Sequence, residues 1–280
     1  MKRNRSWGST GTVLIIVMIS NLYRIRGPLT GALERWGIPG WGATLALLGF
    51  VFLVLTFGLR WLVLQSTPEQ WGFVPAHPQQ FPRLDGGALN AYTATLQGLG
   101  FQWILDYTLV QPGATLGSGF ARLFFHPTHH CYAELGQVFP PNQPPPPLCC
   151  TYMSTVGTDW SLSTTNRAAD GIVYMLRRAK SLWSSHPKQD APALLRSHLE
   201  KRTEIATTLA LPVRADLSWD AYWVAEQQSQ AERRAVMRRR NMVIGLAEAM
   251  LFRLFPKTEW MGDYARLRSK GAIKARETAT

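Results

Sequence analysis

The longest uninterrupted apolar stretch of the chain lies close to its N-terminus. The segment from Trp41 to Leu64 has 24 residues and a single charged side chain, Arg60. At 1.5 Å per residue, a helix of this length exceeds the roughly 30 Å of a bilayer's hydrocarbon core. A buried core helix is disfavoured because no charge occurs between Gly42 and Leu59. The pattern therefore predicts a membrane-spanning helix over 41–64.

A shorter apolar segment precedes it. The run from Thr10 to Ile19 is strongly apolar, and counting from Trp7 to Tyr23 extends it to 17 residues, the lower limit for a span. No small-residue cleavage site follows, which disfavours a secretory signal peptide. Two interpretations stay open. Either 7–23 and 41–64 form a two-helix hairpin across the membrane, or only 41–64 spans and the N-terminal helix lies in the interface.

Behind this anchor the hydrophobic pattern changes to that of a folded domain. Residues 66–85 hold four prolines without apolar periodicity, which predicts an extended linker. From Phe101 to Thr165, runs of aromatic and β-branched residues alternate with short Gly, Pro and Asn clusters. Connections this short join antiparallel strands. The pattern predicts an antiparallel sheet of four or five strands.

The rest of the chain shows helical periodicity. Asp190 and Pro192 mark the start of a helix over Ala191–Leu211, and Ser218 precedes a long helix over Trp219–Phe255. That second helix would be about 55 Å long, more than the width of a domain of this size, so we expect a break near 241–245. The predicted fold class is α+β, with an anchor at 1–65, a Pro-rich linker at 66–85 and a basic, water-facing domain at 86–280.

Charge suggests an orientation for this anchor. The chain has 30 Lys and Arg against 18 Asp and Glu, a net charge of +12. Residues 1–65 carry seven basic and one acidic side chain, so half of the excess is concentrated there. The positive-inside rule then favours an integral membrane protein with its main domain in the cytoplasm, which for a bacterial chain means the inner or plasma membrane.

One cluster combines side chains that zinc prefers. His126, His129, His130 and Cys131 lie within six residues, and Cys149 and Cys150 follow on a later segment. The spacing matches no zinc pattern, and the cluster falls at a predicted hairpin turn. The main interpretation is a surface turn with a buried Cys131 and no metal. A zinc site at these residues is the alternative.

A second cluster is basic. Five arginines precede an apolar segment on the predicted long helix, an arrangement that suits an anionic membrane surface. No aromatic platform accompanies them, which disfavours nucleic acid. The predicted membrane-surface residues are Arg233, Arg234, Arg238, Arg239 and Arg240. The alternative is a solvated basic face that leads into a core helix.

The chain contains no GxSxG, HExxH or Walker-type motif, and its motifs identify no family. Enzymatic activity is left open, and the missing signatures favour a non-enzymatic role. The predicted function is a membrane-anchored accessory or interaction protein, a subunit or tethered partner of a larger membrane complex. Its expected partners are the bilayer, anionic headgroups and other membrane-protein subunits. The alternative is a membrane-bound metal-dependent hydrolase that uses His126, His129, His130 and Cys131.

Overall fold

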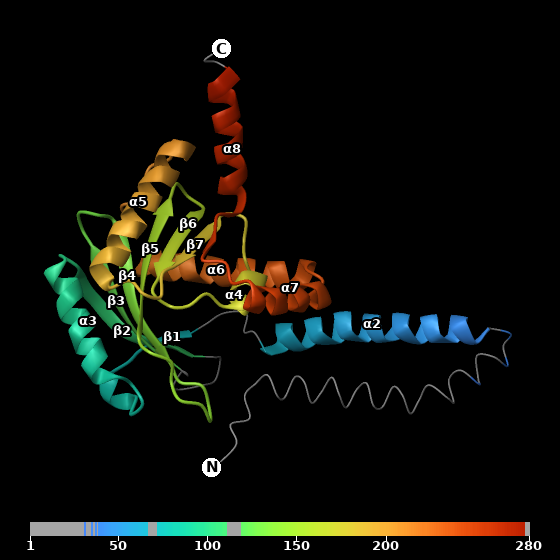
Figure 1. Ribbon diagram of the computed structural model, residues 1–280. Helices are drawn as coiled ribbons and strands as arrows, with labels where there is room; N and C mark the ends of the chain where they lie inside the picture. Colours follow the sequence, from blue (N-terminus) through green and yellow to red (C-terminus); the bar gives the residue numbers. More distant parts are fainter. Residues whose placement is uncertain are drawn as a thin grey trace.

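A single sheet of eight strands organises the described part of the chain (Figure 1). The computed structural model describes Gly31, Arg35, Gly37 and residues 39–66, 72–110 and 119–277. The strands lie side by side in sequence order, and every neighbouring pair is antiparallel except β6 and β7, which run parallel. Their bounds are β1 Gly72–Pro75, β2 Gln102–Val110, β3 Gly119–His126, β4 Cys131–Val138, β5 Cys149–Val156, β6 Trp160–Thr165, β7 Ser181–Ser185 and β8 Glu259–Trp260.

Helices cover both faces of this sheet. The helices are α2 Gly40–Ser66, α3 Gly86–Gly98, α4 Gly171–Met175, α5 Ala191–Leu209, α6 Trp219–Arg239, α7 Met242–Leu254 and α8 Gly262–Glu277, with a 3-10 turn, η1, at Pro78–Gln80. On one face, α3 and α5 bury Leu96 and Leu194 against a core that includes Phe124. On the other face, Tyr222 of α6 packs with Leu123. Adjacent residues of a strand point to opposite faces, so Leu123 and Phe124 anchor two separate layers.

The α+β pattern is confirmed, but the predicted number of strands is wrong. β1 lies inside the segment expected to be a linker and pairs with β2 from Gly72↔Val110 to Pro75↔Tyr107. β7 follows a crossover over 166–180 that contains α4, and this crossover makes its pairing with β6 parallel. β8 has only two residues. The sheet is therefore mixed, with three strands that the predicted meander did not contain.

The predicted membrane span is also contradicted. A helix does form where the apolar run predicted it, as α2. Within the ranges that the structure describes, however, none of the helices combines the length and the apolar character that crossing a membrane requires. Instead, α2 lies along α7 and contacts α6, so its apolar composition serves packing between helices. The inference of an integral membrane protein with a cytoplasmic domain is overturned with it. The other proposed span, 7–23, lies outside the described residues.

The expected break in the long C-terminal helix is confirmed. α6 ends at Arg239, Arg240 is extended with φ −85° and ψ 142°, and α7 begins at Met242. The Asn241 side chain starts α7 by accepting hydrogen bonds from the backbone N–H groups of Val243 (3.0 Å) and Ile244 (3.4 Å). This break lets α7 leave the sheet and pack beside α4 and α2.

Candidate functional site

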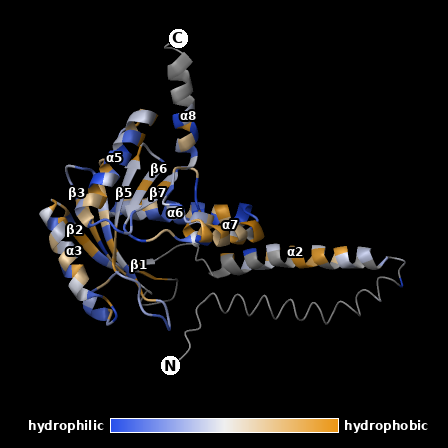
Figure 2. Ribbon diagram, viewed as in Figure 1, coloured by the Kyte–Doolittle hydropathy of each residue, from blue (hydrophilic) through white to orange (hydrophobic). Residues whose placement is uncertain are grey.

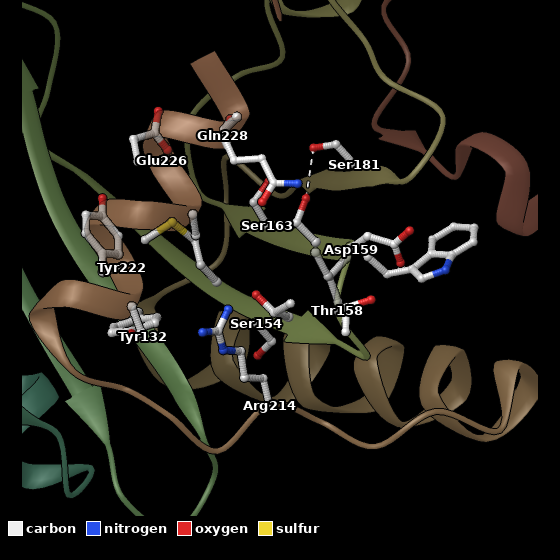
Figure 3. Close-up of a pocket in the computed structure, with 18 of the residues that line it drawn as sticks. Tyr132, Ser154, Thr158, Asp159, Ser163, Ser181, Arg214, Tyr222, Glu226 and Gln228 are labelled. Atoms are coloured by element: carbon white, nitrogen blue, oxygen red, sulfur yellow. Dashed lines mark hydrogen bonds between the residues drawn. The ribbon is translucent and has the colours of Figure 1, made fainter. Parts of the chain in front are cut away.

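A cavity of about 180 Å³ lies between the sheet and α6 (Figure 3). The strands β5, β6 and β7 form its floor, and one side of α6 forms a wall. The segment between α5 and α6 adds Arg214 and Leu217, and the turn between β5 and β6 adds Thr158 and Asp159. Covered sheet faces are usually filled by apolar side chains. This one is left partly open.

The floor of the cavity is rich in hydroxyl groups because of the alternation along two strands. Ser161 and Ser163 of β6 line it, together with Ser181 of β7. The Ser161 hydroxyl donates to Oγ of Ser181 at 3.1 Å, and Nη2 of Arg178 donates to the same oxygen at 2.9 Å. Small polar side chains at these positions leave space beneath α6 where larger apolar ones would fill it.

The walls carry charges of both signs. Arg178 donates from Nη1 to Oε2 of Glu232 at 2.5 Å, and its side chain is only 14% exposed. Arg233 lies 3.5 Å from Oε1 of Glu226. Gln228 extends from α6 toward Ser163 and Ser181 in Figure 3. The cavity is therefore lined by cationic, anionic and neutral hydrogen-bonding groups.

Two of these charged groups are incompletely compensated. Burial raises the pKa of the Glu226 carboxyl, and the nearby Glu134 adds to this effect while Arg233 opposes it. Burial also lowers the pKa of the Arg178 guanidinium, and the positive charge of Arg233 adds to that effect. In each case the charged form is less favourable than in water.

A cluster of two tyrosines and one carboxylate supports the inner end of the cavity. The hydroxyls of Tyr107 and Tyr222 both donate to Oε2 of Glu134 at 2.6 Å, and they lie 2.8 Å from each other. Burial, followed by the charge of Glu134, raises the pKa of both tyrosines well above 10.0. Both tyrosines therefore stay protonated, and they fix the first turns of α6 against β2 and β4.

A serine–histidine–threonine trio occurs on the other face of the sheet. Nε2 of His198 lies 2.9 Å from Oγ of Ser154, and Nδ1 lies 2.9 Å from Oγ1 of Thr164. The spacing resembles that of a nucleophile, a base and an orienting group. However, a threonine replaces the carboxylate, and His198 is fully buried with a pKa lowered to about 3 by that burial. The trio thus joins α5 to the sheet as a neutral network.

The predicted histidine cluster is used to build a turn. Nε2 of His126 lies 3.0 Å from the Leu99 carbonyl oxygen, and Nδ1 accepts from the backbone N–H groups of Thr128 and His129 at 3.2 Å. His130 has the left-handed φ of 49° that closes the hairpin. The described residues include no group of three or more His, Cys, Asp or Glu side chains placed to hold a metal ion.

Cys131 pairs with His126 across that hairpin, but its thiol and that of Cys150 lie in the apolar core. Cys131 is fully buried in the core under α3 and α5, and burial raises the pKa of its thiol to about 12. Cys150 is buried in the same core, and its pKa is also raised to about 12 by burial. The structure therefore does not gather the predicted zinc ligands into one coordination site.

Several of the predicted surface arginines make contacts within the chain. Arg233 pairs with Glu226, Nη1 of Arg234 donates to the Leu64 carbonyl oxygen at 3.2 Å, and Nη1 of Arg240 donates to the Met175 carbonyl oxygen at 2.5 Å. Arg240 also pairs with Glu248. Arg238 and Arg239 are exposed near the end of α6. These contacts hold α6, α7 and α2 together.

Most of the exposed large apolar side chains of the described residues lie on α2 and α7, two helices with many hydrophobic residues in Figure 2. At 100° per residue, the exposed apolar side chains of α2 form two stripes about half a turn apart. The first stripe is Trp41, Leu45, Leu48 and Phe52, and the second is Phe50, Leu53, Phe57 and Trp61. On α7 the exposed side chains are Ile244, Leu246, Met250, Leu251 and Leu254. Apolar surface of this extent marks an interaction site.

Comparison with known proteins adds no family to this description: no protein-family model, curated protein or solved structure matches the chain. The site is thus defined by its own geometry. Sequence reasoning missed the cavity, although the alternation of Ser161, Ser163 and Thr165 along β6 was a visible signal of a polar strand face.

Proposed function

We propose that this chain is a non-enzymatic interaction protein that docks on the α-helices of a larger partner protein through α2. The observation that carries the proposal is the pair of apolar stripes on opposite sides of α2. Within each stripe the residues follow one another at intervals of three or four, as in Trp41, Leu45, Leu48 and Phe52. This spacing is typical of a helix that packs against other helices.

The position of α2 supports a partner that reaches both of its sides. In Figure 1, α2 extends past the sheet and runs beside α7, so much of its length is accessible. A flat lipid surface would cover one side of such a helix, whereas two partner helices would cover both stripes. We therefore propose a helical protein as the partner.

Charge indicates the chemistry of that partner. α2 contains no acidic residue and carries Arg60, while Arg239 and Arg253 are exposed on α6 and α7. Glu248, the one acid of α7, is paired with Arg177 and Arg240. A second copy of this chain would bring arginines together. Partner helices with apolar seams and flanking acidic side chains fit the surface better.

The experiment changes one stripe at a time. Tagged full-length protein is purified from its host in mild detergent, and the partner bound per chain is measured by native mass spectrometry. Leu45→Glu with Leu48→Glu disrupts the first stripe, and Leu53→Glu with Phe57→Glu disrupts the second. We expect each pair to reduce bound partner by about tenfold or more, since buried charges without partners are costly.

The matched control is Val224→Glu, which introduces the same charge at an exposed apolar position on α6. It should retain the partner at the wild-type ratio. Loss of binding from one stripe only would indicate a one-sided surface such as lipid. Wild-type protein that purifies without a partner, or only as its own oligomer, would also contradict the proposal.

A further inference from the structure

The cavity beneath α6 is distinct from the surface on α2 and α7, and its lining points to a ligand. Its volume is about 180 Å³. This is too small for a drug-sized molecule, for which pockets begin at about 300 Å³. It suits a compact metabolite.

The polar groups around this volume come from separate elements. Ser163 lies on β6, Arg178 precedes β7, and Glu226 lies on α6. Arg178 uses Nη1 for Glu232 and Nη2 for Ser181, which leaves other N–H groups of its fork for a further acceptor. Glu226 pairs with Arg233 at 3.5 Å, and the charge of Arg178 also lowers the pKa of its carboxyl. A partly buried carboxylate and a partly buried guanidinium thus line the same small space.

The electrostatic balance of these groups favours a ligand with both charges. Burial raises the pKa of Glu226, so a cation placed next to it would stabilise the carboxylate. Burial lowers the pKa of Arg178, so an anion beside it would stabilise the guanidinium. A ligand with only one charge would compensate one group and leave the other as it is.

We infer that this cavity binds a small zwitterion of the size of a free α-amino acid. Its ammonium group lies beside Glu226, and its carboxylate lies beside Arg178 with the hydroxyl of Ser181 as a further donor. Met153 and Leu217, which also line the cavity, provide apolar contact for a short side chain. Binding involves no chemical step.

The test uses the full chain and defined probes at pH 7. The twenty common L-amino acids are first compared by thermal shift. The best one is then measured by calorimetry against its own amide, which lacks the carboxylate, and its 2-hydroxy analogue, which lacks the amine. We expect saturable one-to-one binding of the amino acid, and binding weaker by about tenfold or more for each analogue, the change expected for loss of a charged hydrogen-bonded contact.

Glu226→Gln should weaken binding of the amino acid by at least the same factor. Glu200→Gln, at an exposed position on α5, should leave this binding unchanged. Ser163→Leu, which fills the cavity, should abolish binding and provides a second variant if Glu226→Gln is unstable. The inference is overturned if none of the amino acids binds, if the amide or hydroxy analogue binds equally well, or if the cavity variants that fold bind like the wild type.

Discussion

His198 shows how one buried side chain makes the stability of the domain depend on pH. Its ring lies between Ser154 and Thr164, and burial lowers its pKa from 6.5 to about 3. Between these two values the unfolded chain binds a proton that the folded chain does not. Stability is therefore fully present above pH 6.5 and is lost as the pH falls toward 3, by at most about 1.4 kcal/mol per pH unit from this group.

The measurement is the free energy of unfolding in urea at several pH values between 3.5 and 6.5. His198→Gln keeps a hydrogen-bonding side chain but cannot take up the proton. We therefore expect the unfolding free energy of this variant to depend less steeply on pH, by an amount that corresponds to about one proton. His77→Gln, at an exposed position, serves as the control and should keep the wild-type slope. Equal slopes for His198→Gln and the wild type would show that His198 is not the group responsible.

At the scale of elements, the separation of α6 from α7 depends on one cap. Asn241 accepts hydrogen bonds from the N–H groups of Val243 and Ile244, which have no partner within the helix. We expect Asn241→Ala to cost about 1 kcal/mol in unfolding free energy and to speed hydrogen exchange at these two amides. Asn241→Asp should retain most of the stability, because aspartate is an equally good cap. Equal losses for the two variants would exclude capping as the cause.

The elements that sequence reasoning predicted correctly are those with local signals. Asp190 and Ser218 cap α5 and α6 as expected, accepting from the backbone N–H groups of Ala193 and Ala221. The break before α7 followed from helix length and from the polar Asn241. These caps and this break depend on residues that are close together in the sequence, so local sequence patterns are enough to predict them.

The elements that were missed depend on distant partners. β1 is a four-residue edge strand whose pairing with β2 outweighs the prolines around it. β7 exists because a crossover brings it beside β6, and the serines of both strands then face α6. The charged groups of the cavity, Arg178 and Glu226, lie 48 positions apart in the sequence. No local sequence pattern indicates that both residues line the same cavity.

The apolar run at 41–64 shows the limit of composition as a guide. It correctly predicted a helix, but the same composition serves a span and a surface that packs on other helices. What distinguished these interpretations was that none of the described helices is long and apolar enough to cross a membrane, together with the contacts of α2 with α7 and α6. The zinc interpretation met a similar limit. His126 and Cys131 pair across the same hairpin, but the His126 ring nitrogens bond to the backbone of Leu99, Thr128 and His129, and the Cys131 thiol is buried in the apolar core.

At the scale of the whole molecule, the two proposed sites bind different partners: the cavity binds a small ligand, and α2 binds a protein. The cavity lies within the layer between the sheet and α6. The stripes belong to α2, which runs beside α7 in Figure 1. In the proposed complex, α2 packs between helices of a partner protein, so that both of its exposed sides become buried. Loss of the small ligand would leave this packing unaffected.

The most direct measurement is site-specific photo-crosslinking in the host cell. A benzophenone side chain replaces Leu48 on one stripe, Phe57 on the other, or Val224 on α6 as the control, all of them exposed positions. We predict that the Leu48 and Phe57 positions both form adducts with the same partner protein, at peptides from its helices, and that the Val224 position does not. Adducts from one stripe only, adducts with lipid, or equal labelling from Val224 would contradict the account.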